Sequence, residues 1–420
     1  MRKAFSMPLP SKLSPAQWFM VTVMLVNAGN YAYNLLLGRW LGPTIFADVA
    51  LLITLLLVLS FVAMTIQLLA AKFVIELPDD KIDNFKKVVY KYALISGSLV
   101  GIVCMLNAQS LASMFQLKHD YVFYLFAAGI PIYFIMSVSR GLHQGKQQFI
   151  ELSRSYLFEM LGRLSVTFVL IGFQLVEPTL AVALGILISF VFGLYPNQFT
   201  RNSVWSRSTL NKSESKAIVH FLLITAFYEG TQIVINNSDI LIVKHYFDHL
   251  EAGLYASLAL IGRVVYFVIW MLIMILLPKV IQAKKDGGNP QKILKSYIKF
   301  IIILTTSLIS LCYLFPETII TLLFGDAYIS LGYLLYQYAL ATSLFALANL
   351  FVYYFLSLSS YKPVIMAMFF GLSQVVFLIL FHKTLEQVVQ IQIALMAGLL
   401  TVTLSYYFYQ NWKQSKQKLA

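Results

Sequence analysis

The sequence predicts an all-α, polytopic membrane protein with about twelve transmembrane helices in two six-helix bundles. Hydrophobic residues make up 59% of the 420 residues, mean hydropathy is +0.77, and 12% of residues are charged, against about 25% in soluble domains. Apolar runs long enough to cross about 30 Å of hydrocarbon recur along the chain. Lysine and arginine concentrate in alternate segments between those runs, which is typical of membrane proteins.

The apolar runs divide into two sets of six around the polar segment 197–216. The predicted spans are 16–38, 45–70, 90–108, 121–139, 150–173, 179–196, 217–243, 251–278, 295–314, 329–357, 360–381 and 387–409. We therefore predict an N-terminal bundle over residues 1–200 and a C-terminal bundle over residues 201–420. Residues 1–14 lack the apolar core and cleavage site of a removable signal peptide.

The distribution of basic residues predicts the orientation of the chain. Of the 31 lysines and arginines, 25 lie in segments that the positive-inside rule places in the cytoplasm together with both termini. Four lie in outer segments: Arg39, Lys118, Lys244 and Lys383. The remaining two, Arg163 and Arg263, lie deep within spans, away from their ends. The net charge of +13 follows from this topology and from attraction to anionic lipid, so we expect no nucleic-acid partner.

A stripe of polar side chains runs along the seventh span. Four residues follow one another at steps of three, four and three and share one helix face: Glu229, Gln232, Asn236 and Asp239. A carboxylate at the bilayer centre costs roughly 2.5 to 3.5 kcal/mol, so this face must meet water, a partner or a ligand. Arg263 in the next span is the candidate partner. For Asp239, near the outer end of its span, a plain interfacial residue is the alternative.

The first and fifth spans carry polar faces as well. Asn27, Asn30 and Asn34 follow one another at steps of three and four, and Glu159 precedes Arg163 by four residues. If these faces point inward, they line one wet central cavity. Amides hydrogen-bond sugars, and the guanidinium fork suits a phosphate. A structural ion pair is the plain alternative for Glu159 and Arg163.

An internal repeat relates the two halves at an offset of 205 residues. Asn27 then aligns with Gln232 and Asn34 with Asp239. Because each half has six spans, both halves have the same orientation in the membrane, which predicts a parallel repeat about an axis along the membrane normal. Such pairs enclose a cavity at their interface.

Signatures of soluble enzymes are absent from the sequence. There is no phosphate-cradling glycine loop, no pair of Cys-x-x-Cys motifs and no metalloprotease helix. Cys104 and Cys312 both lie in apolar segments, so we expect neither a disulfide framework nor a metal site. We expect no enzyme activity and no cofactor other than a coupling proton or sodium ion. Three acids are the candidates for binding that ion: Glu159, Glu229 and Asp239.

Four short motifs resemble those of a known family. They are Gly38-Arg39-Trp40-Leu41-Gly42-Pro43, Arg140-Gly141-Leu142-His143-Gln144-Gly145, Asn237-Ser238-Asp239-Ile240-Leu241-Ile242 followed by Ala252-Gly253-Leu254-Tyr255, and Leu323-Phe324-Gly325-Asp326-Ala327-Tyr328. Ala47 stands where the first motif of the family continues to a glycine. The chain is similar to the polysaccharide-biosynthesis (oligosaccharide flippase) family of the multidrug/oligosaccharidyl-lipid/polysaccharide exporter superfamily.

The resemblance implies a V-shaped pair of six-helix bundles that alternates between inward-open and outward-open states. The implied cargo is an undecaprenyl-pyrophosphate-linked oligosaccharide of O-antigen, capsule or exopolysaccharide, moved across the bacterial cytoplasmic (inner) membrane. Implied partners are the lipid bilayer, a polysaccharide polymerase and a chain-length regulator, with the flippase itself a monomer. The predicted substrate-binding residues are Asn27, Asn30, Asn34, Arg163, Gln232, Asn236 and Arg263.

Two other functions compete with this interpretation. A cation-coupled drug or metabolite exporter of the same superfamily would share the fold and would also need acids in its cavity. Arg163 and Arg263 favour an anionic cargo instead. A membrane glycan ligase or acyltransferase is the alternative of another class, and the short external loops argue against it.

Overall fold

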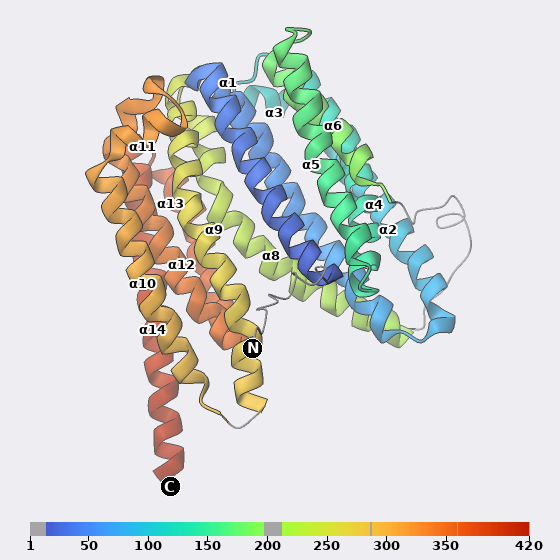
Figure 1. The fold of residues 1–420 in the computed structure, drawn as a ribbon, viewed down its shortest axis with the longest axis vertical. Coiled ribbons are helices and arrows are strands. Elements are labelled where there is room, and N and C mark those ends of the chain that lie inside the picture. The colour runs from blue at the N-terminus through green and yellow to red at the C-terminus, as the bar shows by residue number, and fades with distance from the viewer. Residues whose placement is uncertain (1–13, 197–211, 286–287, 359, 420) are drawn as a thin grey trace, which may run out of the picture. The chain divides into compact units, whose positions relative to one another are not determined.

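The described part of the chain is helical. The structure, a computed structural model, describes residues 14–196, 212–285, 288–358 and 360–419 (Figure 1). The first helices are α1 (Pro15–Glu76), α2 (Asp79–Leu106), α3 (Ala108–Met114), α4 (Tyr121–Gly145), α5 (Phe149–Gly172) and α6 (Pro178–Gly193). The others are α8 (Lys212–Tyr246), α9 (His249–Lys285), α10 (Pro290–Leu314), α11 (Pro316–Leu323), the 3-10 helix η1 (Asp326–Leu334), α12 (Leu335–Ser357), α13 (Lys362–Leu380) and α14 (Leu385–Leu419).

These helices account for the predicted spans. Nine stretches of the described residues are long and apolar enough to cross a membrane. The 62-residue helix α1 contains the first two predicted spans, while the shorter α6 and the helix α9 correspond to the sixth and eighth. The all-α, polytopic prediction is therefore confirmed, and the chain is a multi-pass membrane protein.

The helix α1 begins with a capping box and breaks in the middle. The Ser14 hydroxyl accepts a hydrogen bond from the Gln17 amide at 3.3 Å, and the Gln17 side chain accepts one from the Ser14 amide at 2.9 Å. Gly42 has φ 72° and ψ 168°, a conformation that glycine adopts without a Cβ clash, and Pro43 follows it. The first two predicted spans are therefore two helical segments that follow each other directly, with the helix interrupted at Gly42.

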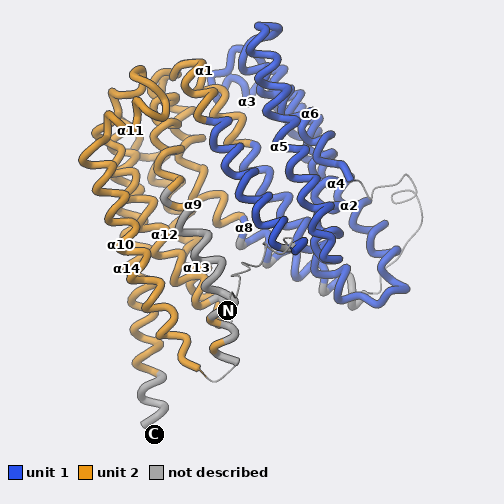
Figure 2. Tube along the Cα trace, viewed as in Figure 1, with its two compact units in different colours: residues 1–34, 56–229 blue, residues 35–55, 230–420 orange. Residues whose placement is uncertain are grey.

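Two compact units make up the molecule (Figure 2). Unit 1 contains residues 1–34 and 56–229, and unit 2 contains residues 35–55 and 230–420. The helices α1 and α8 each contribute to both units. The predicted linker 197–216 lies outside the described residues up to residue 211, and its last residues begin α8. The domain boundary at residue 200 therefore stays a prediction, as does the central cavity.

The core of unit 1 depends on close helix packing at small residues. There α2 and α6 pack on α4, and α5 packs on α6. Gly141 and Gly145 in the last turn of α4 lie directly against the backbone carbonyls of Gln67 and Ala71 in α1, so that a Cβ at either glycine would clash. The predicted span ends at residue 139, whereas α4 continues to Gly145, and these two glycines let its last turns pack closely on α1.

In unit 2, α12 packs against α9, α10, α13 and α14. Residues 35–55 of α1 join this unit through an aromatic cluster: Phe46, Phe324 and Tyr328 have ring centroids within 6.3 Å of one another. The Tyr328 hydroxyl donates a hydrogen bond to the Gly38 carbonyl at 2.7 Å, and Gly38 itself lies against the Phe324 ring. Gly38 of the first motif therefore allows close packing within unit 2.

A buried ion pair also holds residues 35–55 on α8. Lys244 Nζ lies 2.7 Å from Asp48 Oδ1, and the Lys244 side chain is 2% exposed. His249 Nδ1 lies 3.2 Å from the same carboxylate oxygen. The sequence placed Lys244 in an outer segment with Lys383, and this placement stays a prediction; the structure adds that the Lys244 ammonium group is buried against the Asp48 carboxylate.

Lys244→Ala should lower the free energy of unfolding by about 3 to 5 kcal/mol, because it leaves Asp48 without its principal countercharge in a buried position. Lys383→Ala is the matched control, since that lysine is exposed, and it should change stability by less than about 0.5 kcal/mol. Denaturation of the purified protein in detergent, followed by intrinsic fluorescence, measures both. Equal stability of the two variants would contradict a buried pair.

Candidate functional site

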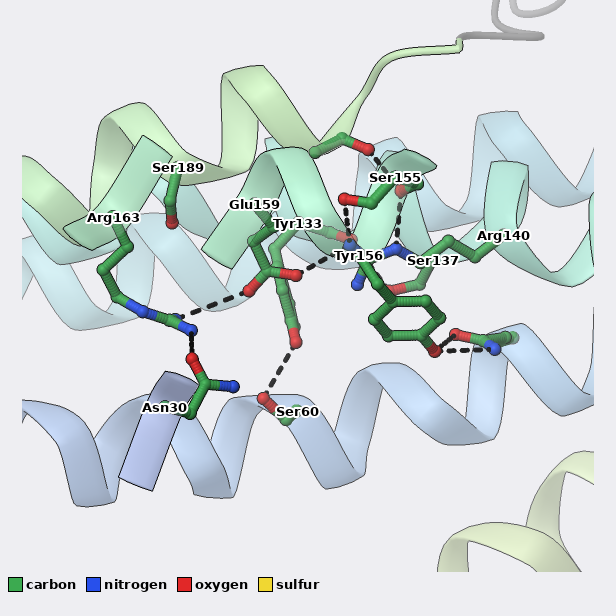
Figure 3. Close-up of polar contacts among 12 residues, drawn as sticks. Asn30, Ser60, Tyr133, Ser137, Arg140, Ser155, Tyr156, Glu159, Arg163 and Ser189 are labelled. Atoms are coloured by element: carbon green, nitrogen blue, oxygen red, sulfur yellow. Dashed lines mark hydrogen bonds and ion pairs between the residues drawn. The ribbon is translucent and has the colours of Figure 1, made fainter. Parts of the chain in front are cut away.

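The polar core of unit 1 is organised by one carboxylate (Figure 3). Glu159 Oε2 accepts a hydrogen bond from Arg140 Nη2 at 2.7 Å, and Glu159 Oε1 lies 3.5 Å from Arg163 Nη1. Arg163 Nη2 then donates to Asn30 Oδ1 at 2.6 Å. Arg140, Glu159 and Arg163 are 3%, 7% and 5% exposed. The structural ion pair that the sequence left open for Glu159 and Arg163 is present, within a larger network.

The inward face of α5 explains how this network forms. Glu159, Arg163 and Thr167 are spaced by four residues and point to the same side of the helix. Thr167 Oγ1 and the Tyr33 hydroxyl lie 3.0 Å apart, so α1 meets this face at two positions. The predicted polar faces of the first and fifth spans are therefore in contact.

Arg140 was not among the predicted site residues. It follows the predicted span 121–139 directly, whereas in the structure it lies within α4 and is buried. Its Nε donates to Ser155 Oγ at 2.8 Å, its Nη2 donates to the Ser155 carbonyl at 3.1 Å, and the guanidinium lies 4.0 Å from the centroid of the Tyr156 ring. The pair Gly141 and Gly145, four residues apart, was the available signal that the helix continues.

The asparagine stripe of α1 lies at the edge of this network. Asn30 is half-buried and receives the hydrogen bond from Arg163. Asn34 Nδ2 donates to the Asn30 carbonyl within the helix at 2.7 Å. Asn27 is exposed, and its side chain makes no hydrogen bond with other described residues. Of the three predicted sugar-binding amides, Asn27 is exposed, Asn34 bonds within its own helix, and Asn30 contacts Arg163.

The unit 1 network contains two guanidinium groups and one carboxylate. A guanidinium is always protonated in proteins, so with an ionised Glu159 the network has one surplus positive charge. Asn30, a neutral acceptor, is the group that faces the guanidinium on its α1 side. An anionic oxygen would be a stronger acceptor at that position.

The polar core of unit 2 is organised by Asp239, which is 2% exposed. Its Oδ2 accepts hydrogen bonds from the hydroxyls of Tyr338 at 2.7 Å and Tyr255 at 3.0 Å. Its Oδ1 lies 4.0 Å from Arg263 Nη2, which also donates to the Asn236 carbonyl. Arg263 is therefore the partner of the stripe, as predicted, although it contacts the backbone of Asn236. Asp239 is buried rather than interfacial.

Two further residues of the predicted stripe, Gln232 and Glu229, lie in different units. Gln232 Oε1 accepts hydrogen bonds from the Tyr266 hydroxyl at 3.2 Å and from Asn349 Nδ2 at 3.4 Å, so it belongs to the core of unit 2. Glu229 belongs to unit 1, is half-buried and makes no ion pair or hydrogen bond with another described residue. The stripe is continuous along α8 but divided between the units.

Tyr255 ends the third motif and Tyr338 gave no signal in the sequence; that both donate to Asp239 could not be predicted, because the partner of a tyrosine hydroxyl depends on the fold. Asn349 was detectable as an amide in the middle of an apolar span. In the described part of the chain no three His, Cys, Asp or Glu side chains gather to hold a metal ion.

Replacing both Tyr255 and Tyr338 by Phe should destabilise the protein by about 2 to 6 kcal/mol, because each loss of a donor to a buried carboxylate costs about 1 to 3 kcal/mol. Tyr333→Phe changes an exposed ring and should leave stability unchanged. Detergent-solubilised protein unfolded by heat tests the pair. A double variant as stable as Tyr333→Phe would show that Asp239 does not depend on these hydroxyls.

Solved structures share the fold of this chain. An inward-facing multidrug resistance MATE family transporter of the MOP superfamily has a TM-score of 0.75 and 14% identity, covering 96% of this chain and 99% of that one. The lipid II flippase MurJ, in an inward closed conformation, has a TM-score of 0.72 and 14% identity, covering 93% and 87%. An outward-facing MATE transporter gives 0.63 and 16%, covering 96% and 97%. At these identities the likeness establishes the MOP transporter fold.

Sequence comparison gives the family. No curated protein matches the chain. A family model described as polysaccharide biosynthesis protein matches residues 36–332, which is more than half of the chain. That range contains all four motifs on which the resemblance was based. The chain belongs to the polysaccharide biosynthesis protein family.

Proposed function

We propose that this protein is a flippase that moves an undecaprenyl-pyrophosphate-linked oligosaccharide across the bacterial cytoplasmic (inner) membrane by alternating access. The observation that carries the proposal is the surplus positive charge of the Arg140, Glu159 and Arg163 network beside the asparagine stripe. A cargo with an anionic head next to a sugar needs both kinds of group, and they lie side by side here. Family membership supports a role in polysaccharide synthesis.

In this mechanism the pyrophosphate binds to Arg163. A phosphate oxygen takes the place of Asn30 Oδ1 as the acceptor for Arg163 Nη2, because the charge-assisted hydrogen bond is the stronger one. The released Asn30 amide, together with Asn27 and Asn34, then binds sugar hydroxyls. The polyprenyl tail of the cargo stays in the hydrocarbon of the bilayer, so flipping requires no free energy for moving the tail into water.

Unit 2 supplies the coupling step in the proposal. Asp239 Oδ1 has no hydrogen-bond donor among the described residues and lies 4.0 Å from Arg263 Nη2. A proton or sodium ion that binds Asp239 weakens its attraction for Arg263, which favours a rearrangement of the core. Glu229, which is unpaired among the described residues, is a second coupling candidate, and Gln232 and Asn236 supply further amides.

The proposal includes the setting of the protein. Both termini lie in the cytoplasm, which follows from the excess of lysine and arginine in the corresponding segments. The flippase acts as a monomer, without catalysis and without a cofactor beyond the coupling ion. A polysaccharide polymerase and a chain-length regulator receive its product.

A cation-coupled exporter of drugs or metabolites is the second candidate. Glu229 favours it, because this half-buried acid has no partner among the described residues and could bind a cationic compound. The fold shared with MATE transporters is compatible with it. The surplus positive charge of unit 1 opposes it, since a cationic cargo would be repelled there.

Deletion of the gene should abolish surface polysaccharide and cause lipid-linked oligosaccharide to accumulate on the inner leaflet, because synthesis continues while flipping stops. Leaflet-specific labelling of the lipid-linked sugar measures this, and plasmid-borne wild-type protein is the control. Unchanged surface polysaccharide with greater sensitivity to cationic drugs would instead support the exporter.

Arg163→Ala and Arg263→Ala should each reduce surface polysaccharide by about tenfold or more, while the corresponding lysine variants retain part of the activity because they keep the charge. Arg154→Ala is the matched control on α5, since Arg154 is half-exposed and pairs with Glu151 one turn away. Quantification of surface polysaccharide at equal membrane expression tests the set. Normal polysaccharide in the Arg163→Ala variant would rule out Arg163 as the pyrophosphate ligand, and normal polysaccharide in the Arg263→Ala variant would rule out a role for Arg263 in coupling.

A further inference from the structure

The two arginines that share Glu159 have different surroundings. Arg140 is fixed on every side: Ser155 and Glu159 accept its hydrogen bonds, and the Tyr156 ring covers its guanidinium. Ser155 Oγ in turn donates to the Gly193 carbonyl. A Cβ at Gly193 would clash with Met136 Sδ and would lie 3.3 Å from Arg140 Nη2, so the glycine lets α6 pack closely beside the network. Residues of α4, α5 and α6 thus surround the Arg140 guanidinium and fix its position.

Arg163 is held less tightly. Its distance to Glu159 is 3.5 Å, compared with 2.7 Å for Arg140, and its shortest contact is the neutral amide oxygen of Asn30. A carboxylate shared by two cations is neutralised mainly by the closer one, since the Coulomb energy falls with distance. Arg140 thus satisfies Glu159, and the positive charge that remains belongs to Arg163.

We propose that Arg140 is a positioning residue that neutralises Glu159 and so keeps Arg163 available for an anionic group of the cargo. The inference rests on the proposed function. Without Arg140, Glu159 would pair with Arg163 at a spacing of four residues, and the network would have no surplus charge. Arg140 acts through Glu159 and does not touch the cargo.

Charge-restoring double variants test this role. The probe is a polyprenyl pyrophosphate, its control is the matching polyprenol, and binding to the full-length protein in detergent is measured together with thermal unfolding. R140Q and R163Q should each bind the pyrophosphate at least tenfold more weakly, because either change leaves one arginine paired with Glu159. R140K keeps the countercharge and should recover most of the binding.

The double variants separate the position of the charge from its amount. R140Q/E159Q and R163Q/E159Q both have one positive charge in the network. R140Q/E159Q should bind within about threefold of wild type, because its charge is on Arg163, whereas R163Q/E159Q should stay at least tenfold weaker. The single variant E159Q removes the carboxylate and keeps both arginines. Because Arg163 is then no longer paired with Glu159, E159Q should bind at least as tightly as wild type.

Three results would overturn the inference. R163Q/E159Q binding as well as R140Q/E159Q would mean that either arginine serves. R140Q/E159Q that stays weak while it unfolds at the wild-type temperature would mean that Arg140 acts on the cargo directly. Weaker binding by E159Q would mean that the carboxylate itself contributes. The proposed function fails in a different way, namely if wild-type protein does not distinguish the pyrophosphate from the polyprenol.

Discussion

The structure depends on one constraint, which is that charge inside an apolar helix bundle must be paired. Taking an ion out of water costs several kcal/mol, and a countercharge with good hydrogen bonds compensates for this. In unit 1, Glu159 meets the constraint for Arg140 and in part for Arg163. The same network connects α4, α5 and α6, since Ser155 accepts a hydrogen bond from Arg140 and donates one to the Gly193 carbonyl.

Unit 2 also pairs its buried charge, but with equal numbers of positive and negative groups in its polar core. Asp239 has one arginine, Arg263, and two tyrosine hydroxyls, so its core is neutral overall. The weak point is its second oxygen, which has no donor within the described residues. A carboxylate that is well bound on one side and open on the other can gain a proton or a small cation without losing its hydrogen bonds to the tyrosines.

Much of this could be predicted from the sequence, because hydropathy and helical spacing are local properties. The spans, the asparagine stripe and the pairing of Asp239 with Arg263 follow from periodicity in one or two helices. Arg140 could not be found in this way, since its burial depends on a serine from α5 and a glycine from α6. The burial of Lys244 was not predicted for the same reason, because Asp48 is distant in sequence and adjacent only in the fold.

The two polar cores lead to a division of labour in the proposed flippase. Of the two polar cores described, the unit 1 network is the one with surplus positive charge, so the anionic head of the cargo would be recognised there. The acid with an open oxygen, Asp239, lies in unit 2, so the coupling ion would bind there. The two sites therefore need not compete for the same groups. The helix α8 contributes to both units, with Glu229 in one and Asp239 in the other, and it is the element through which a change at Asp239 would reach unit 1.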